Sequence, residues 1–161
     1  MATALKQLAN LMHRNSDSLP WIEFDRGIKT QFPHIDEQSG IFVMHSRSEP
    51  GYLGRLHRHV GHVFAVTVSG SWKYLEHPEI NKAGSYLYEP DQSFHTFKCL
   101  DENTELTEFW AIVQGGLEYI DDEGNVLSWL DAAAARNLYE DACNKQSLPV
   151  PDPLGAVDYL K

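Results

Sequence analysis

Few cysteines, few basic residues and no long apolar run occur in this sequence. The two cysteines, Cys99 and Cys143, give neither a disulfide framework nor a Cys-x-x-Cys metal motif, so both are expected to be reduced and buried. No apolar stretch approaches the roughly 20 residues that a membrane-spanning helix needs. The first residues lack a charged segment followed by a long apolar one, so no signal peptide is predicted and the expected location is the cytoplasm.

Basic residues are outnumbered by acidic ones, 13 to 23, and the net charge is −10. Binding of nucleic acid or of an anionic membrane requires a basic patch. The lysines and arginines are scattered along this chain, and Arg55 and Arg58 come nearest to a cluster. The sequence therefore predicts neither a nucleic-acid partner nor a membrane partner.

Hydrophobic spacing divides the 161 residues into four parts of a single domain. Residues 1–20 form a helical N-terminal extension with leucines at helical spacing, Leu5, Leu8 and Leu11. Residues 21–130 contain many short strand patterns separated by turn residues, which is typical of an antiparallel barrel or sandwich. Residues 131–145 are alanine-rich and begin with a capping residue, Asp131, which predicts a helix. Residues 146–161 form a proline-rich tail.

Two features of residues 21–130 predict how individual strands lie in the sheet. Residues 63–68 are a continuous apolar run with β-branched members, which predicts a strand buried on both faces. The strand expected over residues 28–35 contains Pro33, which predicts a sheet edge or a bulge there.

Three histidines are candidate metal ligands. His57 and His59 are two residues apart, so a strand would project both from one face. His95 follows a strand pattern that ends at Pro90, and pairing of that strand near the first would bring three imidazoles together. Such a set suits Fe(II), Zn, Cu or Ni better than Mg or Ca. His62 is out of register and is predicted not to be a ligand. The other histidines are interpreted as surface or loop residues: His13, His34, His45 and His77.

The residues that frame these histidines resemble the cupin signature. Its second half matches from Gly84 through Pro90 to His95, with Gln92 in place of the inner glycine. Its first half matches through the His-x-His pair and Gly70. Ordinary histidines at strand ends are the alternative interpretation, which would require the framing residues to be coincidental. The resemblance implies an all-β fold, a double-stranded β-helix or jelly-roll-like barrel, here with a short N-terminal helix and a C-terminal helix.

The glutamate that usually accompanies the cupin histidines is missing from its usual place. It would fall at position 63 or 64, and this sequence has Val63 and Phe64 there. The resemblance therefore implies a three-histidine centre without that glutamate. Fe(2+) is the expected metal, with Zn(2+) or another divalent transition metal as the alternatives.

Three segments, residues 71–77, 83–90 and 95–96, look like two groups of cupins, and residues 116–125 and the C-terminal helix look like the first of these groups alone. One group is the 2,4'-dihydroxyacetophenone dioxygenases, in which non-haem iron on three histidines cleaves a hydroxyketone C–C bond with oxygen to give two carboxylic acids. That resemblance implies iron ligands at His57, His59 and His95, an aromatic ketone substrate and dioxygen. The other group is the metal-binding domain of ChrR-type anti-sigma factors, which implies ligand sensing without turnover. A β-diketone-cleaving or other metal-dependent cupin enzyme is a third reading.

Further candidates lie on neighbouring strands. Glu89 is a candidate general base or an anchor for a histidine, and Tyr74 is a candidate hydrogen-bond donor to a phenol or ketone. Val63, Phe64, Phe94 and Trp110 are candidate walls of a substrate pocket. A solvated strand end, a solvent-facing strand and plain core packing are the respective alternatives. Exposed strand edges and the N-terminal leucines predict a homodimer or homotetramer.

Overall fold

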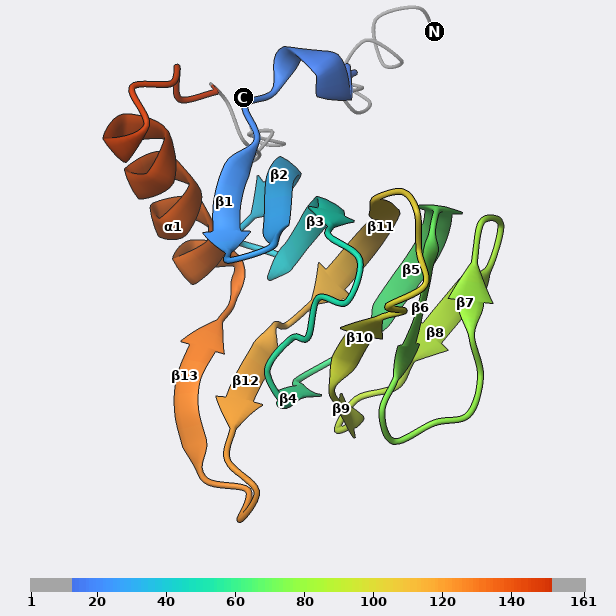
Figure 1. Ribbon diagram of the computed structural model, residues 1–161. Helices are drawn as coiled ribbons and strands as arrows, with labels where there is room; N and C mark the ends of the chain where they lie inside the picture. Colours follow the sequence, from blue (N-terminus) through green and yellow to red (C-terminus); the bar gives the residue numbers. More distant parts are fainter. Residues whose placement is uncertain (1–12, 152–161) are drawn as a thin grey trace, which may run out of the picture.

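The computed structural model describes residues 13–151 and is almost entirely β-structure with one C-terminal α-helix (Figure 1). The predicted all-β fold class is confirmed. The helix expected within residues 1–20, with its leucine stripe, falls largely outside the described residues, as does most of the tail. A short 3₁₀ turn, Ser16–Ser18, precedes the first strand, and its amide at Asp17 is capped by the side chain of Asn15.

The largest sheet has six strands. Its order is β1 (Ile22–Asp25), β2 (Ile28–Asp36), β3 (Ile41–Ser48), β11 (Thr107–Gln114), β5 (Val63–Ser69) and β8 (Tyr86–Glu89). All pairings are antiparallel. Pro33 lies where the register of β2 against β3 shifts, so the predicted bulge is present, while β1 covers β2 and takes the edge position.

Two smaller sheets face the six-stranded sheet. One has the order β13 (Val126–Leu130), β12 (Leu117–Ile120), β4 (His57–His59) and β9 (Phe94–His95). The other has the order β10 (Phe97–Cys99), β6 (Ser71–Tyr74) and β7 (Asn81–Lys82). The backbone hydrogen bonding is divided among three sheets, so of the two predicted arrangements, barrel and sandwich, the structure has the sandwich. One cavity has lining residues from all three sheets.

Strand β5 is buried on one face, in contrast to the prediction of burial on both. Val63, Ala65 and Thr67 are buried, whereas Phe64 and Val66 are exposed. The period-2 geometry of a strand sends alternate residues to opposite sides, and only the inner side of this sheet is covered by the smaller sheets. An apolar run is compatible with either arrangement, so the sequence alone did not distinguish them.

Helix α1 (Ala132–Lys145) confirms the predicted C-terminal helix and packs beside β1 and β2 (Figure 1). The Asp131 side chain accepts a hydrogen bond from the Ala134 amide at 2.8 Å, which satisfies one of the free N–H groups of the first turn. Tyr139 lies on the inner face of the helix. Its ring centroid is 5.4 Å from that of Phe32, and its hydroxyl donates a hydrogen bond to the Pro20 carbonyl oxygen.

Both cysteines are buried free thiols, as predicted. Among residues 13–151, the structure has no helix of the length and apolar character needed to cross a membrane.

Candidate metal centre

The three candidate histidines meet at the pairing of β4 with β9. His57 and His95 lie directly opposite each other in this antiparallel pair, and His59 shares the face of His57 two residues along. The ring centroids are 4.8 to 5.1 Å apart, and the Nε2 atoms of His59 and His95 are 3.2 Å apart. One nitrogen from each ring lies within 4.8 Å of the others. The fold thus brings together residues 36 or more positions apart in the chain.

The orientation of the His57 ring is fixed by a backbone contact. Its Nδ1 lies 2.9 Å from the carbonyl oxygen of Arg55, which only accepts hydrogen bonds, so Nδ1 carries the proton. The lone pair is therefore on Nε2. Burial lowers the pKa of His57 to about 3, and the charges that His95 and His59 carry when protonated act in the same direction. This imidazole is neutral at physiological pH, as a metal ligand must be.

A buried carboxylate stands next to the histidines. Glu89 ends β8, is 5% exposed, and its Oε2 lies 2.8 Å from His59 Nε2 and 3.4 Å from His95 Nε2. Burial opposes ionisation of Glu89, but hydrogen bonds from His59 and His95 and their charge outweigh it, so its pKa lies below the ordinary value. The candidate base thus lies within reach of the same point as the imidazoles.

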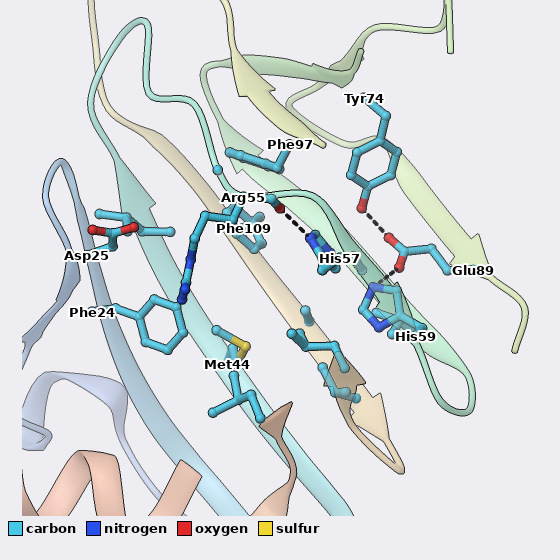
Figure 2. A pocket seen from close by; sticks show the side chains of 18 of the residues that line it. Phe24, Asp25, Met44, Arg55, His57, His59, Tyr74, Glu89, Phe97 and Phe109 are labelled. Carbon is cyan, nitrogen blue, oxygen red and sulfur yellow. Dashed lines mark hydrogen bonds and ion pairs between the residues drawn. The ribbon is translucent and has the colours of Figure 1, made fainter. Parts of the chain in front are cut away.

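Tyr74 supports this carboxylate from β6. Its hydroxyl donates a hydrogen bond to Oε1 of Glu89 (Figure 2). Its ring is stacked on that of His95, with centroids 3.7 Å apart. Burial, followed by the charge of Glu89, raises the pKa of Tyr74 well above its usual value, so the phenol keeps its proton. The structure therefore gives the Tyr74 hydroxyl a partner within the protein.

The donor set fits a transition metal. Glu89 Oε2 and His59 Nδ1 are buried side-chain atoms without a hydrogen-bond partner among the described residues. Lone pairs of imidazole nitrogen and a carboxylate oxygen at about 3 Å repel one another unless a cation or proton lies between them. Imidazole with carboxylate suits Fe, Zn, Ni or Mn, and three nitrogens exclude the all-oxygen shell that Ca²⁺ prefers.

The centre opens on a cavity of about 110 Å³ whose walls are mostly apolar. Apolar side chains come from the six-stranded sheet and from β6 and β10 facing it: Phe24, Met44, Phe109, Trp72 and Phe97. Four polar residues that the sequence had not indicated line it as well: Asp25, Tyr52, Arg55 and Tyr119. No local motif marks these four, because they come from separate strands and loops that only the fold brings together.

Three of the predicted pocket walls, Phe64, Phe94 and Trp110, do not line this cavity. Phe64 is 41% and Phe94 58% exposed, and Trp110 stacks on His45 at 4.1 Å on the other side of the sheet. Val63, also predicted as a wall, does line the cavity. For the other three the inward-facing side chains belong to adjacent residues: Ala65, His95, and Phe109 and Ala111. Alternation along a strand makes such an error place the side chain on the opposite face.

Two other histidines have partners away from the centre. His62 Nδ1 lies 2.9 Å from the Tyr88 hydroxyl at the outer side of β8, which leaves His62 outside the cluster. His45 corrects the interpretation of a surface residue, since it is 3% exposed. Its ring nitrogens lie 3.0 Å from Gln31 Oε1 and 2.6 Å from Glu108 Oε1.

The sequence profile of the ChrR Cupin-like domain matches residues 10–115, which is more than half of the chain. The protein belongs to this cupin family. Its predicted membership of the cupin superfamily is thereby confirmed. A search among curated proteins gives no significant match.

Solved structures of cupins have the same architecture as this cupin. A protein of unknown function with a cupin-like fold from Ralstonia eutropha JMP134 is 29% identical over 88% of this chain and 94% of its own, with a TM-score of 0.79. An RmlC-like cupin from the same organism is 25% identical, with 94% and 98% coverage and a TM-score of 0.85. An acetylacetone dioxygenase from Acinetobacter johnsonii, 20% identical with 83% and 93% coverage and a TM-score of 0.73, shares the fold.

Proposed function

We propose that this cupin is an iron-dependent dioxygenase that cleaves a C–C bond of a small ketone bearing an adjacent hydroxyl or carbonyl group. The observation that carries the proposal is the buried Glu89 carboxylate beside three converging imidazoles at the inner end of an apolar cavity. Structural histidines need no open cavity, whereas a small substrate does. An aryl hydroxyketone of the 2,4'-dihydroxyacetophenone type is the expected substrate.

His57, His59 and His95 would hold Fe(2+), with Zn(2+) or another divalent metal as the alternative. Bound iron supplies a Lewis acid for the ketone oxygen and open positions for dioxygen. The overall reaction balances when a hydroxyketone R–CO–CH₂OH and O₂ give R–COOH and HCOOH. Both oxygen atoms enter the products, so no external reductant is required.

Glu89 is suited to remove the proton next to the carbonyl group. Its pKa lies below its ordinary value, so the free carboxylate is present at neutral pH, and Oε2 faces the point where the histidine nitrogens converge. Tyr74 donates to the other oxygen, Oε1, and holds the carboxylate in one orientation. Loss of the α-proton leaves an enolate, whose negative charge complements a cationic centre with neutral imidazole ligands.

The size of the cavity favours a small substrate. An engineered protein cavity of about 150 Å³ accommodates benzene. The cavity here, about 110 Å³, matches one ring or a short diketone. Its aromatic walls, among them Phe24 and Phe109, favour a flat molecule by roughly 0.5–1.5 kcal/mol through offset or edge contacts. The known activity of the structural neighbour from Acinetobacter makes β-diketones the second substrate class to test.

Oxygen uptake by the iron-loaded protein tests the proposal. The panel contains hydroxyacetophenones and β-diketones, with iron-loaded His57→Ala as the control and carboxylic acid products identified by mass spectrometry. Uptake on at least one substrate above the control is expected. No uptake with iron demonstrably bound would overturn the dioxygenase.

A second candidate is a metal-binding module that recognises a ligand without turnover. Membership of the ChrR Cupin-like domain family is the observation that favours it. In that case the amount of ligand bound per metal centre would stay constant over hours in air, and no product would form.

A further inference from the structure

Arg55 lies at the mouth of the cavity, apart from the metal centre. Its side chain extends toward Phe24 and Asp25 of β1, while its own backbone carbonyl accepts the hydrogen bond from His57 (Figure 2). The guanidinium carbon lies over the Tyr119 ring, 3.7 Å from its centroid, which is a cation–π contact. Arg55 lines the cavity and is also exposed to solvent.

Three other arginines are paired with carboxylates. Arg47 pairs with Glu108, Arg58 with Glu118 and Arg136 with Glu37. Within residues 13–151 no carboxylate oxygen lies within 4.0 Å of the Arg55 guanidinium. Asp25 lines the same cavity, and its Oδ1 accepts a hydrogen bond from the Arg26 amide at 2.7 Å.

The surroundings of Arg55 provide further donors. Tyr52 and Tyr119 both line the cavity, and burial raises the pKa of each phenol, so both remain protonated. The positive charge of Arg55 opposes this rise at Tyr119. In a chain of net charge −10, the Arg55 cation, two hydroxyl donors and the Asp25 carboxylate lie together along the cavity wall, and the inner end holds the Glu89 carboxylate.

We propose that Arg55 binds a carboxylate at the outer end of the substrate. This inference rests on the proposed function and narrows its substrate class to small oxo acids, in which an enolisable carbonyl group enters first and the carboxylate stays at the mouth. A guanidinium presents parallel N–H groups that match the two oxygens of a carboxylate. The same fork discriminates against a neutral ligand of equal size.

The test compares 4,6-dioxoheptanoate with its methyl ester. Both contain the same 1,3-diketone and differ in the charge of the far end. Calorimetry on the zinc-loaded protein measures affinity without turnover, because zinc has no redox chemistry, and a repeat on the metal-free protein separates the mouth from the metal. Wild type is expected to bind the acid at least tenfold more tightly than the ester.

Arg55→Gln is expected to weaken binding of the acid about ten- to a hundredfold and to leave the ester unchanged. Arg55→Lys keeps the charge without the planar fork and should be intermediate. Arg26→Gln removes the same charge from an exposed residue that does not line the cavity and should change neither ligand. Because Arg55 is exposed, all three variants should keep the melting temperature of wild type.

Equal affinity of wild type for acid and ester would overturn the inference. An equal loss of affinity for the acid and the ester in Arg55→Gln would also overturn it, because it would show that the side chain only packs against the ligand. Oxygen uptake decides the proposed function separately. Acid-selective binding without uptake would keep the role of Arg55 and remove the dioxygenase, and uptake without acid selectivity would do the reverse.

Discussion

Glu89 on β8 lies directly opposite Val63 on β5 in the antiparallel pairing of the two strands. Side chains opposite each other across such a pair project from the same face, with Cβ atoms about 5 Å apart. Position 63 is one of the two where the cupin signature usually has its glutamate. The carboxylate that the first motif lacks is therefore supplied by the neighbouring strand, and it approaches the histidines at 2.8 Å.

This geometry gives a prediction for Glu89→Gln, which keeps the shape of the side chain and removes its charge. If Glu89 moves a proton, turnover should fall roughly 10²- to 10⁴-fold while metal content stays near that of wild type. Exchange of the substrate α-hydrogen with deuterated water, followed by NMR, measures the proton step directly.

Tyr74→Phe is the matched control, since it removes the hydroxyl that holds Glu89 and keeps the ring stacked on His95. It should retain metal and lose less activity than Glu89→Gln. Loss of metal from Glu89→Gln as complete as from a histidine variant would instead make Glu89 a ligand.

The histidines themselves provide a second prediction. His95→Ala should lower bound metal strongly, because it leaves a vacancy among the nitrogens that meet at one point. His62→Ala should lower it little, since His62 contacts Tyr88 outside the cluster. Metal per chain is measured by plasma mass spectrometry after dialysis. Equal loss from both variants would contradict the assignment of the centre.

The sequence predicted the parts of this cupin that depend on local spacing. The His57 and His59 pair follows from strand parity, and the helix beginning after Asp131 follows from alanine content and capping. It did not predict which face of a central strand is inward, because an apolar run such as 63–68 looks the same for a strand buried on one face or on two. The error at Phe64 has this origin.

The sequence also did not predict the contacts between residues of distant segments. The hydrogen bond from Tyr74 to Glu89 and the cation–π contact of Arg55 with Tyr119 depend on how β6, β8 and β12 are placed around the cavity. No residue spacing within one segment encodes these distances. Arg55 attracted notice in the sequence only as part of a weak basic pair with Arg58, whose side chain in fact pairs with Glu118.

A third prediction concerns stability and pH at the His45 network. Burial opposes ionisation of Glu108, but hydrogen bonds from Arg47 and His45 outweigh it and hold its pKa below the ordinary 4.5. A carboxyl group whose pKa is lowered by folding stabilises the native state above its unfolded pKa, and this contribution is lost as pH falls below it. Glu108→Gln should therefore be less stable than wild type at pH 7, by about 1.5–3 kcal/mol.

The difference between wild type and Glu108→Gln should narrow as pH falls below about 4.5, because protonated Glu108 then resembles glutamine. Urea unfolding at several pH values measures it. Glu37→Gln is the control, since Glu37 forms an exposed pair with Arg136 that should contribute less than about 1 kcal/mol. A difference that stays constant from pH 7 to pH 3 would contradict the assigned role of Glu108.

The outer side of the large sheet leads to the fourth prediction. Phe64 lies between Tyr88 of β8 and Ile112 of β11 in register, and Val66 and Tyr86 extend the same strip. These five side chains are 41% to 64% exposed. A contiguous apolar strip of this kind on a sheet face marks a contact surface, and β8 also ends the sheet with an open edge. We propose that a second copy of this chain covers the strip in a homodimer.

Phe64→Glu should dissociate this homodimer, because it would place a carboxylate at the centre of an apolar interface. Sedimentation equilibrium at micromolar concentration should give twice the 18.3 kDa chain mass for wild type and one chain for the variant. Leu127→Glu is the control, since Leu127 is an exposed apolar residue of β13, outside the strip. A wild-type mass of one chain, or dissociation of Leu127→Glu as complete as that of Phe64→Glu, would show that the strip is not the interface. Since Phe64 points away from the cavity that Val63 lines, the variant should keep its metal, which separates assembly from the chemistry of the centre.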